Sequence, residues 1–178
     1  MTDENKGNFT SCAHLANPAD VEFAENTYAN LLEEGRDPLQ MMLQLQYQAQ
    51  NKLSDTLPHV PRPQDLKTCG EKLEWMRLND LAIGDEVYEL YTALGGMSRG
   101  EKPASAVWKP WKAQHLELRD IPFSELSESD QLEAKFELID QWHFILSKFL
   151  GMGMDAEEIF KLYAVKQAEN LRRWANNY

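Results

Sequence analysis

The chain has 178 residues, of which 43% are hydrophobic and 26% are charged, and this is the composition of an ordinary globular protein. Its net charge of -11 argues against a protein that binds duplex DNA, because such a protein needs a basic face. The charge is compatible with an anionic nucleotide held through metal ions. No apolar run is long enough to cross a bilayer, no secretory segment precedes the first helix, and Cys12 and Cys69 fit no zinc or redox spacing. We therefore expect a cytoplasmic protein with reduced thiols and no membrane partner.

Helix signals recur along the first half of the chain, whereas strand signals are nearly absent. Asn17-Pro18 predicts a helix with proline at its first position, which Gly35 closes. Asp37-Pro38 repeats the pattern and predicts a second helix that runs to about Leu53. The proline-rich segment 57–63 cannot be helical and is expected to be a stiff connector.

The rest of the chain continues this helical pattern. A third helical stretch is predicted from about Glu71 to Leu94, with Asn79-Asp80 as an alternative start of a separate helix. A glycine-rich loop over residues 95–105, one short turn or helix at residues 108–112 and a second connector over residues 114–126 are expected to follow. We expect an all-α fold, a bundle of five or six helices, in one domain over residues 1–178. Residues 1–11 are expected to be a frayed tail.

The stretch from Glu133 to Phe144 is the middle of a predicted helix that is apolar on most sides. A candidate capping box at residues 127–130 opens this helix, and Gly151 with Gly153 is expected to end it. A helix of this kind is expected to be buried. A last helix should begin after Asp155 and reach about residue 174.

Two pairs of acids lie on the two most hydrophobic helices. Glu86 and Glu89 are three residues apart and therefore share one helical face, and Glu137 and Asp140 have the same relation on the central helix. If these helices pack side by side, four carboxylates converge, and carboxylates are the ligands that hard Mg²⁺ prefers. The alternative that spacing leaves open is two solvated helix faces.

The helix from residue 38 is rich in glutamine. Gln46 and Gln50 fall on its apolar stripe, beside Leu43 and Leu53. A buried amide needs partners for its donors and its acceptor, and the edge of a nucleobase is one such partner. The alternative is that these amides form hydrogen bonds with the neighbouring backbone.

Basic residues supply two further candidate sites. Lys166, Asn170 and Arg173 form one polar face of the last helix, which suits phosphates but also suits a surface ladder with Glu169. The segment 108–112 has the sequence Trp-Lys-Pro-Trp-Lys. Its tryptophan pair suits either the wall of a nucleotide pocket or the cap of a hydrophobic core.

Taken in order, these motifs resemble those of the all-α nucleoside triphosphate pyrophosphatases, the superfamily of the dimeric dUTPases. Residues 89–98, 104–112 and 156–163 resemble more closely the phage branch, the dCTP pyrophosphatases. The resemblance covers about residues 12 to 178. The four motifs that carry it are Glu86-Val-Tyr-Glu89, Trp108-Lys-Pro-Trp-Lys112, Glu137-Leu-Ile-Asp140 with Gln-Trp-His-Phe, and Lys166-x-x-x-Asn170-x-x-Arg173.

The resemblance implies hydrolysis of a deoxypyrimidine triphosphate, dCTP and also dUTP, to the monophosphate and pyrophosphate. It further implies two or more Mg²⁺ ions, a homodimer, other enzymes of nucleotide metabolism as partners, and a place in the host-cell cytoplasm if a phage encodes the chain. Glu86 is the expected catalytic carboxylate. The implied metal ligands are Glu86, Glu89, Glu137 and Asp140, and the implied substrate-binding residues are Gln46, Lys166, Asn170 and Arg173. The patterns described above add Gln50, Trp108, Lys109 and Lys112 to the expected substrate-binding residues.

Two other functions remain open on the sequence. One is a housekeeping pyrophosphatase of the same superfamily that acts on modified or non-canonical nucleotides. The other is a non-enzymatic, acidic helical module whose tryptophans bind a partner protein. Magnesium-dependent release of pyrophosphate from dCTP separates these functions.

Overall fold

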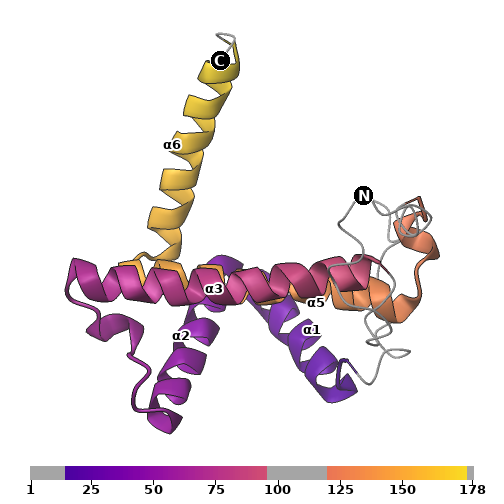
Figure 1. The fold of residues 1–178 in the computed structure, drawn as a ribbon, viewed down its shortest axis with the longest axis horizontal. Coiled ribbons are helices and arrows are strands. Elements are labelled where there is room, and N and C mark those ends of the chain that lie inside the picture. Colours follow the sequence, from indigo (N-terminus) through magenta and orange to yellow (C-terminus); the bar gives the residue numbers. More distant parts are fainter. Residues whose placement is uncertain (1–14, 96–119, 176–178) are drawn as a thin grey trace. The chain divides into compact units, whose positions relative to one another are not determined.

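The computed structural model describes residues 15–95 and 120–175. Over these ranges the regular elements are helices and no strand occurs, so the predicted all-α class is confirmed. No helix of the described ranges is both long enough and apolar enough to span a membrane. In chain order the elements are α1 (Pro18–Glu33), α2 (Pro38–Thr56), the 3-10 turn η2 (Pro63–Asp65), α3 (Cys69–Leu94), the 3-10 turn η5 (Phe123–Glu125), α5 (Glu128–Met152) and α6 (Ala156–Ala175) (Figure 1).

Capping residues set the boundaries of the first two helices. The side-chain oxygen of Asn17 accepts from the N–H of Ala19 at 3.0 Å, and Asp37 accepts from the N–H of Leu39 at 2.9 Å. Each cap satisfies a backbone donor that the first helical turn leaves without a partner. Gly35 has a φ of 64°, the left-handed conformation in which glycine ends a helix without strain. Both predicted starts are confirmed, and α2 continues past Leu53 to Thr56.

The later helices also follow their sequence signals, with one difference. The hydroxyl oxygen of Ser127 accepts from the N–H of Asp130 at 3.1 Å before α5, and Asp155 accepts from the N–H of Glu158 at 2.8 Å before α6. The alternative helix start at Asn79-Asp80 is wrong, because α3 continues through both residues. Asn79 is buried there, and its amide donates to the carbonyl of Trp75 within the helix.

Gly151 does not end the central helix, which corrects the sequence expectation. Helix α5 passes through it to Met152, and Gly153, with a φ of 81°, makes the turn into α6. A Cβ atom on Gly151 would lie 2.5 Å from both Cδ1 and Nε1 of Trp75. The absence of a side chain therefore lets the indole of α3 lie directly against the backbone of α5.

Replacing Gly151 by alanine is expected to lower the free energy of unfolding by about 1–3 kcal/mol, because the new methyl group overlaps the buried Trp75. Gly84→Ala is the matched control, since Gly84 also lies inside a helix and a Cβ there meets nothing within 4 Å. The control should gain about 0.5–1 kcal/mol from helix propensity. Urea denaturation of both variants measures the two changes, and a Gly151 variant as stable as the control contradicts the packing assignment.

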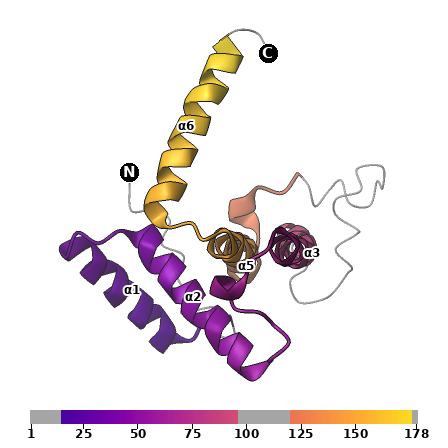
Figure 2. The same cartoon turned by 90° about the vertical axis from the view of Figure 1, so that its left-hand side faces the viewer.

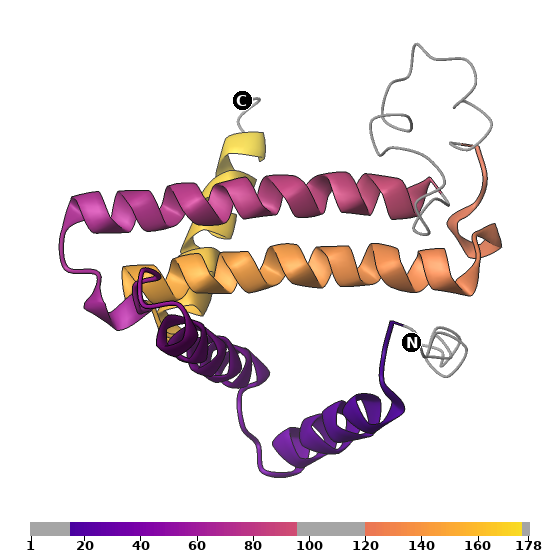
Figure 3. The ribbon, with the colours of Figure 1, turned by 60° about the horizontal axis from the view of Figure 1, so that its bottom comes forward.

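The chain divides into two compact units. Unit 1 comprises residues 1–30 and 80–144, and unit 2 comprises residues 31–79 and 145–178. Helices α3 and α5 contribute to both units, and in each unit a segment of α3 lies beside a segment of α5 (Figure 3). A single domain over the whole chain stays a prediction.

The core of unit 2 forms where α2, α3 and α5 meet (Figure 2). Leu43, Leu66, Trp75 and Leu146 are buried there. The indole N–H of Trp75 donates to the backbone carbonyl of Ser147 at 2.8 Å, so the one polar atom of this ring is satisfied inside the core. This bond fixes the start of α3 against the end of α5.

Candidate metal centre and base-recognition residues

Helix α5 presents its acidic side to the interior of unit 1. Glu137 is only 4% exposed, whereas its neighbours Leu138 and Ile139 are 54% and 49% exposed. The expectation that the apolar sides of this helix are buried is therefore wrong at Leu138 and Ile139, and Glu137 does not lie on the solvated face that the spacing left open. A buried carboxylate carries a large desolvation cost unless something compensates it.

Three carboxylates converge where α3 and α5 meet in unit 1. Glu86 and Glu89 come from α3 and Glu137 comes from α5, and one oxygen of each lies within 4.8 Å of the others. The three-residue spacing on α3 places both of its acids on the face that meets α5. Because Glu137 is buried, this arrangement differs from a solvated acidic surface.

Burial and neighbouring negative charges raise the pKa values of two carboxyl groups in this cluster. Burial, a hydrogen bond with Glu86 and the nearby charges of Glu89 and Glu133 raise the pKa of Glu137 to about 8. The pKa of Glu86 is also raised, chiefly by burial. Without a cation the pair therefore holds a proton at neutral pH.

A cation would fit the carboxylate oxygen that this cluster leaves without a partner. Within the described residues, Oε2 of Glu137 and Nε2 of Gln141 are buried and have no hydrogen-bond partner. An orphaned buried carboxylate oxygen beside two further carboxylates is an all-oxygen donor set, which suits a hard divalent ion. Gln141 follows Glu137 by one helical turn and was not singled out by the sequence, since an isolated glutamine gives no signal of this kind.

Asp140 lies at the edge of the cluster. Its charge contributes to the raised pKa of Glu86, so it faces the same region. Its Oδ1 also lies 3.6 Å from Nδ1 of His143, one turn further along α5, and both side chains are about half exposed. Asp140 is thus close enough to add to the negative potential, and its role as a metal ligand stays a prediction.

Gln46 and Gln50 lie in unit 2 and meet at one side chain. The amide nitrogens of both glutamines donate to the hydroxyl oxygen of Ser147, at 2.9 Å and 3.0 Å. Ser147 is completely buried on α5, whereas both glutamines are partly exposed. Each bond uses one N–H of its amide, which leaves the second N–H and the carbonyl oxygen of that amide for other partners. Their predicted role in reading a base is not tested by these bonds.

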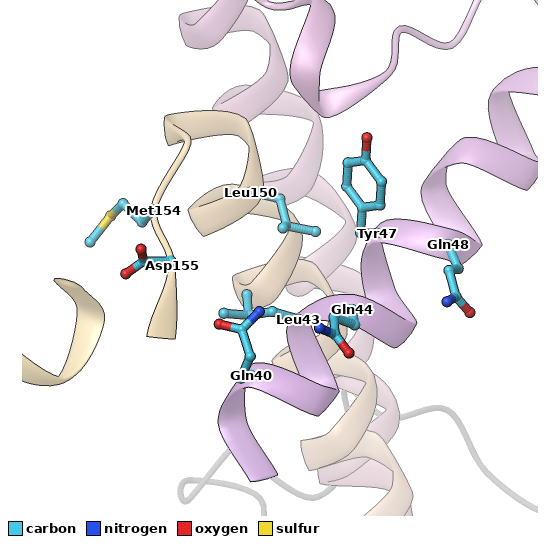
Figure 4. A pocket seen from close by; sticks show the side chains of 8 residues that line it. All are labelled: Gln40, Leu43, Gln44, Tyr47, Gln48, Leu150, Met154 and Asp155. Carbon is cyan, nitrogen blue, oxygen red and sulfur yellow. The ribbon is translucent and has the colours of Figure 1, made fainter. Parts of the chain in front are cut away.

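A shallow pocket of about 260 Å³ also lies in unit 2. Its walls come from α2 on one side and from the junction of α5 and α6 on the other (Figure 4). Gln46 and Gln50 are not among the residues that line it, so this pocket does not coincide with the predicted base-reading amides. The lining residues are Gln40, Leu43, Gln44, Tyr47, Gln48, Leu150, Met154 and Asp155.

Comparison with known proteins gives two relatives of nearly the same length. The dCTP pyrophosphatase of Enterobacteria phage LZ5 is 51% identical over 171 residues, which are 96% of this chain and 98% of that protein. The dCTP pyrophosphatase of Enterobacteria phage T4 is 48% identical over 170 residues, with the same coverage of 96% and 98%. The chain belongs to the phage dCTP pyrophosphatase family. The family resemblance drawn from the motifs is thereby confirmed.

A third relative of this chain is a longer protein. It is a DNA replication protein of Enterobacteria phage T4, 49% identical over 158 residues, which are 89% of this chain and 40% of that protein. No family model matches the chain, and no solved structure matches it.

The predicted phosphate-binding residues lie on α6 in unit 2. Lys166 and Arg173 are exposed and Asn170 is half-buried. The guanidinium of Arg173 donates to Glu169 at 3.0 Å, which is the surface ladder that the sequence left open as the alternative. Such an exposed pair contributes little to stability and is easily replaced by a phosphate, so the binding role of this face stays a prediction.

The remaining predicted substrate-binding residues, Trp108, Lys109 and Lys112, lie outside the described residues. The same holds for Cys12 and for the expected N-terminal tail at residues 1–11. Cys69 is an exposed free thiol at the start of α3.

Proposed function

We propose that this chain hydrolyses dCTP, and also dUTP, to the deoxynucleoside monophosphate and pyrophosphate with the help of Mg²⁺. Family membership supports a pyrophosphatase of this kind. The observation that carries the proposal is the convergence of Glu86, Glu89 and Glu137 around an orphaned, buried carboxylate oxygen. In the infected cell this reaction would clear dCTP and dUTP from the nucleotide pool during phage DNA synthesis.

The acidic cluster defines the proposed reaction centre. Glu86, Glu89, Glu137 and Asp140 would hold the magnesium ions. Bound there, two or more ions would neutralise phosphate charge and lower the pKa of a bound water. Glu86 would orient the attacking water and accept its proton, because it is less buried than Glu137 and belongs to the same carboxylate cluster. Attack of this water breaks a phosphoanhydride bond and releases pyrophosphate, with little covalent work for the protein.

Other residues of the chain would bind the substrate. Lys166, Asn170 and Arg173 would contact the phosphates and sugar, and Arg173 would exchange Glu169 for a phosphate oxygen. Gln46 and Gln50 would read the edge of the pyrimidine, whereas Trp108, Lys109 and Lys112 would complete the nucleotide site.

A substrate panel tests the proposal directly. Pyrophosphate release from dCTP, dUTP, dTTP and dATP should be magnesium-dependent and fastest with dCTP and dUTP. Cytosine and uracil differ by exchange of donor and acceptor at the four-position, and an amide can satisfy both by turning over. Equal turnover of dATP would contradict a pyrimidine site, and turnover of modified nucleotides alone would favour the housekeeping alternative. A folded protein with no magnesium-dependent turnover would favour the non-enzymatic module.

We also propose that the chain forms a homodimer, with further enzymes of nucleotide metabolism as partners. Phe160, Tyr163, Leu171 and Trp174 recur at three- and four-residue spacing, apart from a gap at Gln167, and each is more than half exposed in the single chain. An apolar stripe of this kind on a helix is usually covered by another surface. Light scattering should give twice the chain's mass of 20.5 kDa, and Tyr163→Asp should shift the mass toward the monomer. A wild-type monomer at micromolar concentration contradicts the dimer.

A further inference from the structure

Ser147 is the point at which the two predicted base-reading glutamines are joined. Its side chain is 0% exposed, and its hydroxyl oxygen accepts from Nε2 of both Gln46 and Gln50. A lone buried serine gives no sequence signal, because its partners lie about a hundred residues earlier in the chain. The hydroxyl is therefore a common hydrogen-bond acceptor that orients both amides.

The backbone around Ser147 is held in place from the opposite side. The indole N–H of Trp75 donates to the Ser147 carbonyl at 2.8 Å, and the ammonium of Lys72 donates to the carbonyl of Gly151 one turn later. Gly151 leaves room for the indole, since any Cβ there would overlap it. The serine thus stands on a rigid part of α5, with α3 on one side and the glutamines of α2 on the other. Rigid support of this kind lets a side chain define the geometry of its neighbours.

The chemistry of one hydroxyl limits how the amides can turn. A hydroxyl has two acceptor lone pairs and a single proton. Accepting from both glutamines occupies both lone pairs of Ser147, so each amide turns its nitrogen toward the serine and its carbonyl oxygen away from it. The hydroxyl therefore fixes the orientation of both amides together.

We propose that Ser147 is a specificity-determining positioning residue, whose hydroxyl sets which donors and acceptors Gln46 and Gln50 present to the pyrimidine. The proposal rests on the proposed function, because it assumes that these amides meet the base. Cytosine and uracil present opposite patterns at the three- and four-positions, so a change in amide orientation changes the preference between dCTP and dUTP. Ser147 itself acts through the glutamines and touches neither the substrate nor the metal ions.

Ser147→Ala tests the proposal through the ratio of kcat/KM for dCTP to kcat/KM for dUTP. Loss of the hydroxyl removes the bond that orients both amides, so this ratio should change by about fivefold or more from its wild-type value, through KM rather than kcat. In a Gln46→Ala background the same substitution should change the ratio by less than about twofold, because residues that act as a unit are not additive. Ser147→Cys keeps the position filled with a weak acceptor and should move the ratio in the same direction.

Ser54→Ala is the matched control. Ser54 is also a buried serine of unit 2, but its hydroxyl donates to the backbone carbonyls of Gln50 and Pro61 and not to a glutamine amide. Its ratio should stay within about twofold of the wild type although its stability falls in the same way. A folded Ser147→Ala or Ser147→Cys variant with an unchanged ratio overturns the inference. A wild-type protein that turns over neither dCTP nor dUTP overturns the proposed function instead.

Discussion

Replacing Glu86 by glutamine is expected to reduce kcat for dCTP by about 10³-fold while the protein stays folded. The amide cannot accept a proton from the attacking water, and a positioned base contributes about 10²–10⁴-fold in such reactions. It also removes one of the carboxylates that meet within 4.8 Å. Steady-state release of pyrophosphate with saturating Mg²⁺ measures the loss, and circular dichroism verifies the fold.

The same substitution should leave the metal-free protein as stable as the wild type or more stable. The pKa of Glu86 is raised by burial and by repulsion from Glu89, Asp140 and Asp85, so its ionised form is unfavourable in the folded chain. Asp85→Asn is the control, since Asp85 is exposed on the same helix and lies outside the three-carboxylate cluster. The control should keep activity within about threefold. Near-normal turnover by the Glu86 variant would contradict the catalytic assignment.

The helices could be predicted from the sequence because their ends carry local chemistry. Asn17, Asp37 and Asp155 each place a carboxylate or amide oxygen on a backbone N–H two or three residues later, as the capping rules require. The role of Gly151 could not be predicted in this way. A glycine near a helix end is usually interpreted as a terminator, whereas the missing Cβ of Gly151 makes room for Trp75, which is distant in the sequence.

The sequence predicted which acids form the site, but it did not predict which of their side chains are buried. Three-residue spacing correctly placed Glu86 and Glu89 on one face, and Glu137 meets them. The spacing left open whether Glu137 faces water, and the apolar pattern of α5 predicted that Leu138 is buried, whereas Glu137 is buried and Leu138 is exposed. Which face of an amphipathic helix turns inward depends on what the neighbouring helix offers. A pattern within one helix does not contain that information.

The partners of Gln46 and Gln50 illustrate the same limit. Their place on an apolar stripe indicated amides in need of partners, and the sequence offered a nucleobase or nearby backbone. The structure adds a third partner, Ser147, that a stripe pattern cannot show. Long-range side-chain bonds of this type depend on how α2 packs on α5. The residue spacing within either helix does not predict that packing.

The stability of the metal-free protein is expected to fall as the pH rises from about 4.5 to about 8. The folded pKa of Glu137 is raised from 4.5 to about 8, so the folded chain binds more protons than the unfolded chain over this range. Its contribution is fully present below the unfolded pKa and is lost as the pH rises through the folded pKa. The free energy of unfolding changes through this one group by at most about 1.4 kcal/mol per pH unit. Thermal and urea unfolding in the presence of EDTA measure it.

Magnesium should reverse this trend, because a cation that binds the cluster displaces the proton of Glu137. The stabilisation by Mg²⁺ should therefore grow between pH 5.5 and pH 8, and calorimetry in two buffers of different ionisation enthalpy should detect proton release on binding. Glu137→Gln is the decisive variant. It should flatten the metal-free pH dependence, since the neutral amide has nothing to titrate, and it should weaken magnesium binding at pH 8. If this variant keeps the wild-type slope, or if magnesium stabilises the wild type less at pH 8 than at pH 5.5, the buried carboxyl does not hold the ion.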